Sequence, residues 1–117
     1  MNNNFIDVLE KNGAETKSTL ERFLGDQELY YSFLKEYVVK ESLEELFAAE
    51  KENNYEEMSK IIHTIKGVAL NLGITPLAKL SIEILKDYHS NNFDEMKEKI
   101  TLFTEEFEHW ILIVESL

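Results

Sequence analysis

The residues with the clearest chemical potential are His63, Lys66 and Gly67. Residues three and four positions apart are neighbours on the surface of a helix. If this stretch is helical, an imidazole, an ammonium group and a residue without a side chain therefore meet within about one turn. Imidazole is a nucleophile, and an ammonium group can hold anionic oxygens. The spacing therefore needs an explanation.

The surrounding stretch, from Asn54 to Gly73, is predicted to form the helix that carries these residues. At ~100° per residue it has one apolar face centred on Ile65, and His63 falls about 160° away from that centre. Asn54 is the expected N-cap and Gly73 the expected left-handed C-cap. The apolar face comprises Met58, Ile61, Ile62, Ile65, Val68, Ala69 and Leu72, and the polar side comprises Ser59, Lys60, His63, Lys66 and Gly67.

His63 could also be a structural histidine of the core or an incidental surface residue, without a chemical role. A core histidine conflicts with the helical periodicity. An incidental surface histidine leaves Gly67 unexplained, because a glycine inside a helix costs ~1 kcal/mol relative to alanine. Lys66 alone would be typical of a solvated helix face. His89 and His109 have no partner ligands at metal spacing, so we expect surface or helix-end histidines there and no metal site.

Composition narrows the class of protein. The chain has 117 residues, a formal net charge of −11, four glycines, one proline and no cysteine. The acidic balance disfavours nucleic acid and anionic membranes as partners, and the few helix breakers favour an all-α fold. The start, Met1 followed by NNNFIDVLE, lacks the pattern of a signal peptide, and no apolar run has the length of a membrane span. We expect a cytoplasmic protein.

The predicted elements form an antiparallel four-helix bundle over 26–117, preceded by one or two short capping helices in 1–25, all within one domain. A first short helix is expected over Asn4–Lys11, ended by Asn12 and Gly13. A second is expected to begin with a capping box at Ser18 and Glu21 and to end at Gly25. The four bundle helices are expected to run from Asp26 to Glu50 or Lys51, from Asn54 to Gly73, from an N-cap at Thr75 with Pro76 at N1 to Ser90, and from Phe93 to Ser116.

The sequence His63-Thr-Ile-Lys66-Gly67-Val-Ala-Leu-Asn-Leu-Gly73 resembles the H-x-x-K-G-x-x-x-x-x-G motif of histidine-containing phosphotransfer (HPt) domains. The segment before the first long helix and the turn after the motif are also similar, so the resemblance extends over roughly Leu24 to Tyr88. The final helix agrees in length and pattern only.

The resemblance implies that His63 accepts a phosphoryl group from a phosphoaspartate on a receiver domain and passes it to another receiver. It further implies that Lys66 stabilises the charge of the phosphate and that Gly67 clears space for the partner. Response-regulator receivers and a hybrid histidine kinase are then the expected partners, with Mg²⁺ on the receiver and no cofactor on this chain. Contacts with the partner are expected from Ser59, Lys60, Leu70 and Asn71. We expect a monomeric phosphoryl carrier and, because no Gly-rich phosphate loop is present, no autonomous kinase activity.

Two positions depart from the family pattern. Leu70 stands where relatives commonly carry Gly or Ala, and Leu85 stands where some relatives hold the imidazole with Gln or Glu. An alternative function is therefore a helical adaptor that binds a receiver without being phosphorylated. A phosphoacceptor module of a chemotaxis-type kinase is a third reading, which the lack of a kinase portion weakens.

Overall fold

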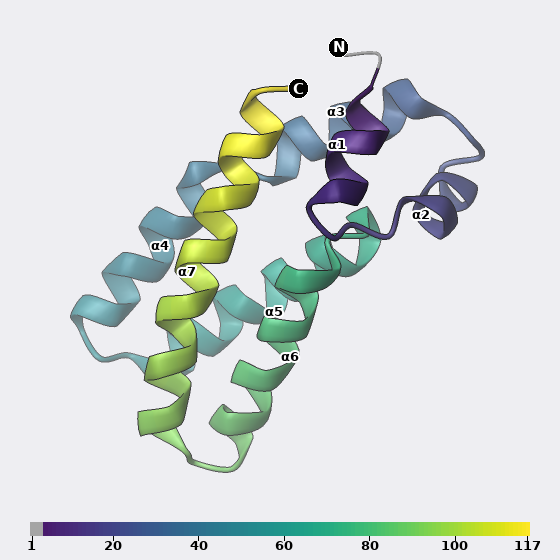
Figure 1. Ribbon diagram of the computed structural model, residues 1–117. Helices are drawn as coiled ribbons and strands as arrows, with labels where there is room; N and C mark the ends of the chain where they lie inside the picture. Colours follow the sequence, from purple (N-terminus) through teal and green to yellow (C-terminus); the bar gives the residue numbers. More distant parts are fainter. Residues whose placement is uncertain (1–3) are drawn as a thin grey trace.

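The computed structural model describes residues 4–117, and this part of the chain is helical throughout, with short connections and no strand (Figure 1). The prediction that the start of the chain lacks a signal-peptide pattern concerns, in part, residues 1–3, which lie outside the described part. The all-α prediction is confirmed. The helices are α1 (Phe5–Lys11), α2 (Thr16–Arg22), α3 (Gln27–Tyr37), α4 (Lys40–Lys51), α5 (Tyr55–Leu72), α6 (Thr75–His89) and α7 (Phe93–Glu115).

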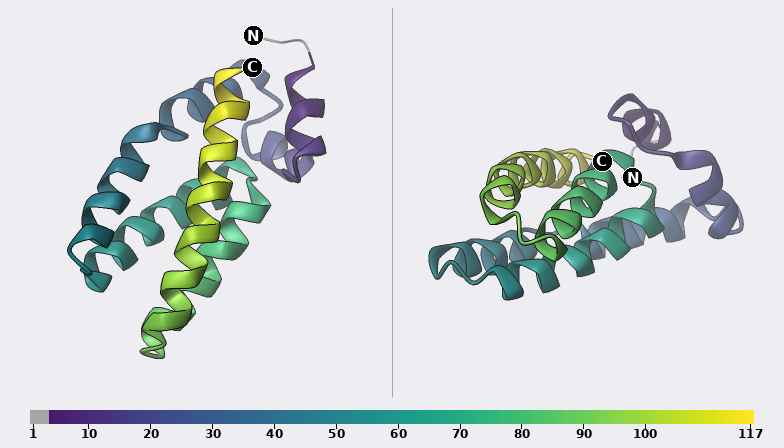
Figure 2. Two further views of the ribbon diagram at one scale, coloured as in Figure 1. Left: turned by 60° about the vertical axis from the view of Figure 1, so that its left-hand side comes forward. Right: turned by 90° about the horizontal axis from the view of Figure 1, so that it is seen from below.

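Four helices, α4 to α7, form the bundle. Each packs against the next along the chain, and α4 also contacts α7, so the four enclose a common core (Figure 2). Helix α3 continues the line of α4 at one end and contacts α5 and α7. The predicted four-helix bundle is therefore present, and its first helix is divided into α3 and α4 by a bend.

That bend corrects the prediction of one continuous helix from Asp26 to Glu50 or Lys51. The helix stops at Tyr37 and restarts at Lys40. Between them Val38 and Val39 leave the helical region, with ψ angles of 81° and 153°. Consecutive β-branched residues have low helix propensity. Val38 places its side chain in the core with 3% of its surface exposed, so packing favours the bend.

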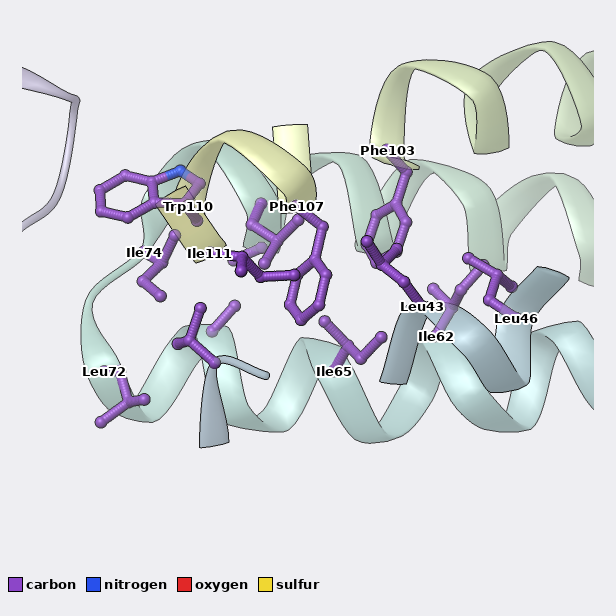
Figure 3. Packing of buried hydrophobic residues seen from close by; sticks show 14 of the residues in the cluster. Leu43, Leu46, Ile62, Ile65, Leu72, Ile74, Phe103, Phe107, Trp110 and Ile111 are labelled. Carbon is purple, nitrogen blue, oxygen red and sulfur yellow. The ribbon is translucent and has the colours of Figure 1, made fainter. Parts of the chain in front are cut away.

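The core is built largely from the inward sides of α5 and α7. Figure 3 shows Phe103 and Phe107 reaching from α7 toward α5, where Ile62 and Ile65 lie. All four side chains are at least 96% buried. At apolar transfer values of about 1.5–3 kcal/mol for each fully buried side chain, this contact holds α5 in a fixed rotation about its axis. The opposite side of α5 is thereby turned to solvent.

The short helices α1 and α2 lie beside one end of the bundle, as the sequence predicted, and this is the end where α5 finishes (Figure 1). Their details differ from the prediction. The N-cap of α2 is Glu15, whose carboxylate accepts the Ser18 amide, so the expected capping box at Ser18 is wrong. The helix ends at Arg22, because Leu24 and Gly25 adopt left-handed φ angles of 56° and 74°.

The boundaries of α6 shift by one residue from the prediction. Helix α6 begins at Thr75 with Ile74 as its N-cap, so Thr75 does not cap it; Pro76 still lies in the first turn, where its missing N–H costs nothing. Further along, Asp87 pairs with Lys99 of α7 across 2.8 Å. This hydrogen bond raises the pKa of Lys99. Within residues 4–117, no helix is long and apolar enough to cross a membrane.

Candidate functional site

Helix α5 presents His63 on the side away from the core. The Asn54 side chain caps its first turn by accepting the Glu57 amide at 3.0 Å, and Gly73 ends it with φ 73°, as predicted for both residues. Ile65, two residues after His63, is buried, while the His63 side chain is exposed. The imidazole is therefore accessible from solvent on a helix whose rotation is set by its buried face.

A hollow of about 390 Å³ lies beside His63 between α5 and α6. We call it the His63 hollow. Helix α6 contributes a buried floor at Leu85 and a ring pair at its end, where Tyr88 and His89 meet edge to face at 5.4 Å. The hollow is lined by Ser59, Lys60, His63 and Thr64 of α5 and by Leu85, Tyr88 and His89 of α6.

The two lysines near the histidine differ in their surroundings. Lys60 pairs with Glu56 one turn earlier, with 3.5 Å between Nζ and Oε1, in an exposed contact. Lys66 forms no salt bridge or side-chain hydrogen bond with any residue among 4–117. Its ammonium group is therefore the one of the two that is unengaged and available to an incoming anion.

Gly67 opens a second depression, on the other flank of α5. A Cβ atom added at this glycine would meet nothing within 4 Å. The depression lies between α5 and the α2–α3 segment, and we call it the Gly67 groove. Its far wall is aromatic: the Phe23 and Phe33 rings are 5.5 Å apart, and the Phe33 and Tyr37 rings 5.8 Å apart. Sequence reasoning missed this wall, although Phe33 and Tyr37 at i and i+4 shared a face.

The expected partner-contact residues lie in different surroundings. Ser59 is 8% exposed, and its hydroxyl donates to the Glu56 carbonyl at 2.6 Å, so its expected place on the solvent face is wrong. Asn71 is exposed and lines the Gly67 groove. Leu70 is 53% exposed and lies with Ile82 of α6 in a separate shallow depression. Leu70 thus adds an apolar spot near the site.

Leu85, where the sequence departs from the family pattern, lines the His63 hollow. Its side chain is buried under the His63 hollow, so no polar group at this position can hold the imidazole. Glu83 and Lys86, its polar neighbours in sequence, do not line the hollow. Among residues 4–117, no group of three or more His, Asp or Glu side chains is arranged to hold a metal ion.

The C-terminal end of α5 is held by residues of α2 and α3 and by Glu15, which precedes α2. The Arg22 guanidinium donates to the carbonyls of Leu70 and Asn71 at 3.0 and 2.9 Å, and the Tyr30 hydroxyl donates to the Leu72 carbonyl at 2.7 Å. The Glu15 amide donates to Gly73. These bonds satisfy carbonyls that a helix end leaves without partners. Burial raises the pKa of the Tyr30 phenol above its ordinary value, so the group stays a donor.

Fold and site together define a helical bundle that displays His63 on the solvent side of α5. Beside it lie an open glycine and a lysine that has no ionic or hydrogen-bonding partner among residues 4–117. The Hpt domain family model matches residues 20–111. The chain belongs to the Hpt domain family, whose members carry phosphoryl groups in phosphorelays. No curated protein and no solved structure matched the chain.

Proposed function

We propose that this protein is the histidine phosphotransfer intermediate of a multistep phosphorelay, accepting the phosphoryl group on His63. The observation that carries the proposal is the exposed imidazole of His63 opposite the buried face of α5. Three residues further on, the ammonium of Lys66 has no partner among residues 4–117. A mid-helix glycine with open space beside it lies one residue further.

The transfer step follows from these groups. The lone pair of a His63 ring nitrogen attacks the phosphorus of a receiver's phosphoaspartate, forming a P–N bond. The P–O bond to the aspartate breaks, and the carboxylate leaves with its electron pair. The proton on the other ring nitrogen passes to solvent. Lys66 would neutralise charge on the phosphoryl oxygens, and the same steps in reverse deliver the group to a second receiver aspartate.

The proposal assigns no cofactor to this chain. In phosphoryl transfer the protein mainly positions the groups and neutralises charge, and we place the Mg²⁺ on the receiver partner. We further propose a cytoplasmic monomer without an ATP site, which receives phosphate from a hybrid histidine kinase through that kinase's receiver. Contacts with receivers would come from Lys60, Leu70 and Asn71 around His63.

The experiment is a two-stage transfer. The purified chain is incubated with a receiver domain that carries a radiolabelled phosphoaspartate, separated from it, and then mixed with a second, unphosphorylated receiver. We expect an acid-labile, alkali-stable label on the chain in the first stage and its loss to the second receiver. A chain that stays unlabelled while it binds the receiver would contradict the proposal.

One observation favours the adaptor alternative. Leu70, 53% exposed on α5, and Ile82, 49% exposed on α6, give the neighbourhood of the site an apolar character that suits docking more than chemistry. In an adaptor, Leu70→Ala would weaken receiver binding, whereas His63→Gln would leave the signalling output of the relay unchanged. In a phosphoryl carrier, His63→Gln would abolish that output.

A further inference from the structure

We propose that the His89 ring donates a hydrogen bond to the phosphoryl group carried on His63, and so contributes to the site from α6. The inference rests on the proposed function and deepens it. His89 is the last residue of α6 and lines the His63 hollow together with His63 itself.

The direction of the helices brings the two rings toward each other. Helices α5 and α6 run antiparallel, joined through Gly73 and Ile74 (Figure 1). Side chains on a helix lean toward its N-terminus. His63 therefore leans toward the start of α5, which lies beside the end of α6, and His89 leans back along α6 toward the level of His63.

Three of the other polar groups of the hollow are already engaged: the Ser59 and Thr64 hydroxyls and the Lys60 ammonium. The Tyr88 hydroxyl also lines the hollow and makes no hydrogen bond with residues 4–117. The Ser59 hydroxyl donates to the Glu56 carbonyl, and the ammonium of Lys60 pairs with the Glu56 carboxylate. Leu85 supplies only an apolar floor. The His89 ring makes no hydrogen bond with residues 4–117, and it packs edge to face with Tyr88 at 5.4 Å.

The residues lining the hollow include no carboxylate. A dianionic phosphoryl group there would meet donors and apolar surface, with no like charge in the wall. An imidazole keeps at least one N–H in either protonation state, so His89 remains a donor throughout. The bond involves no proton transfer: the ring N–H stays on His89 and approaches one non-bridging phosphoryl oxygen. Lys66 would approach the same group from further along α5.

The first test uses phosphoramidate as the phosphoryl donor and observes the imidazole resonances of the full chain by ¹H–¹⁵N NMR. Mass spectrometry establishes uptake of one phosphoryl group at His63. We expect the ring signals of His89 to move on phosphorylation. Those of His109, whose Nε2 lies 3.1 Å from Asn12 Oδ1, should stay in place. Unmoved His89 signals would overturn the inference.

Variants separate a hydrogen bond from packing. His89→Phe keeps a ring against Tyr88 and removes the N–H, whereas His89→Gln retains an N–H donor. At fixed phosphoramidate and ammonia, we expect His89→Phe to lower the equilibrium ratio of phosphorylated to free chain roughly three- to tenfold. His89→Gln and the control His109→Phe should stay within about twofold of wild type.

An unchanged ratio in His89→Phe would overturn the inference while leaving the proposed function intact. A His89→Gln variant as impaired as His89→Phe would also overturn it, because an N–H donor would then not suffice. If phosphoramidate and phosphorylated receivers both leave His63 unmodified, the proposed function fails, and the role of His89 fails with it.

Discussion

The Tyr30 hydroxyl donates a hydrogen bond to the Leu72 carbonyl across 2.7 Å, which joins α3 to the last turn of the helix that carries His63. Tyr30 is fully buried, and its ring stacks on Phe23 with the centroids 5.4 Å apart. The position of α5 is thus fixed at its end by the same segment that forms the aromatic wall of the Gly67 groove.

Because the Tyr30 phenol is buried, the stability of the protein should depend on pH in the alkaline range. The folded-state pKa of Tyr30 is raised by burial above the unfolded value of about 10. Below pH ~10 both states hold the phenol proton, and the contribution of the group is complete. As pH rises past ~10 the unfolded state loses the proton first, so stability falls. Urea unfolding from about pH 8 to pH 11 should show this loss.

Tyr30→Phe is the matched change. At neutral pH it should lower the free energy of unfolding by about 1–3 kcal/mol, because the Leu72 carbonyl loses its buried donor. Its stability should then fall less steeply at alkaline pH than that of the wild type. Tyr37→Phe, at a tyrosine that is 45% exposed, should preserve the wild-type slope. Equal slopes for Tyr30→Phe and wild type would contradict the assignment.

Gly67 and Gly73 should respond in opposite ways to alanine. At Gly67 the helix is regular and the added Cβ meets nothing, so Gly67→Ala should raise stability by about 0.5–1 kcal/mol. The methyl group should also slow phosphoryl transfer by narrowing the approach to His63. At Gly73, with φ 73°, the Cβ would collide with the Glu15 carbonyl and the Thr19 hydroxyl, so Gly73→Ala should cost at least ~1 kcal/mol. Chemical denaturation and transfer rates measured on both variants provide the check.

Lys66→Ala should slow the chemistry without weakening the fold. An ammonium group on the phosphoryl oxygens is a charge-assisted contact, and its loss should reduce the single-turnover transfer rate roughly tenfold or more. Stability should change by less than about 0.5 kcal/mol, since the side chain pairs with no group in the described part of the chain. Lys60→Ala removes an ammonium group that is paired with Glu56. It is the comparison variant, and it should have a smaller effect on the rate. A larger loss of transfer rate in Lys60→Ala than in Lys66→Ala would contradict the role of Lys66 in stabilising the phosphate charge.

Ile65→Ala should have the opposite signature, with stability lost and chemistry retained in the molecules that stay folded. The side chain is 4% exposed and faces Phe107 (Figure 3). Truncation should cost about 2–5 kcal/mol through lost burial and the cavity left behind. Thr64→Ala, at the exposed neighbouring position, should stay within about 0.5 kcal/mol. Urea denaturation measures the free energy of unfolding of both variants. Equal losses of stability in Ile65→Ala and Thr64→Ala would contradict the prediction.

The sequence predicted the histidine helix well, because one long apolar face determines its rotation and local residues determine its ends. Asn54 and Gly73 act as caps through bonds and backbone angles within a few residues. The same logic failed at Val38 and Val39, where the apolar stripe continues across a break in the helix. At α2, Glu15 competes with Ser18 for a capping role that local spacing alone does not decide.

The flanks of the site could not be read from the sequence, because they depend on how neighbouring helices meet α5. Helix α6 covers the side of α5 that contains Ser59 and brings His89 to the His63 hollow. On the other flank, Phe23 and Tyr37 reach the Gly67 groove from segments on either side of the turn at Gly25. Periodicity predicts which side of a helix is apolar, whereas these contacts follow from packing across sequence separations of about 25 to 45 residues.

Phosphorylation at His63 is tested most directly by determining which of the three histidines carries the phosphoryl group. His63→Gln, His89→Gln and His109→Gln are each incubated with a phosphorylated receiver, and acid-labile phosphate on the chain is quantified. We expect His63→Gln to take up no phosphate and the other two variants to be labelled to about the wild-type level. Labelling of His63→Gln at the wild-type level would show that His63 is not the phosphoacceptor.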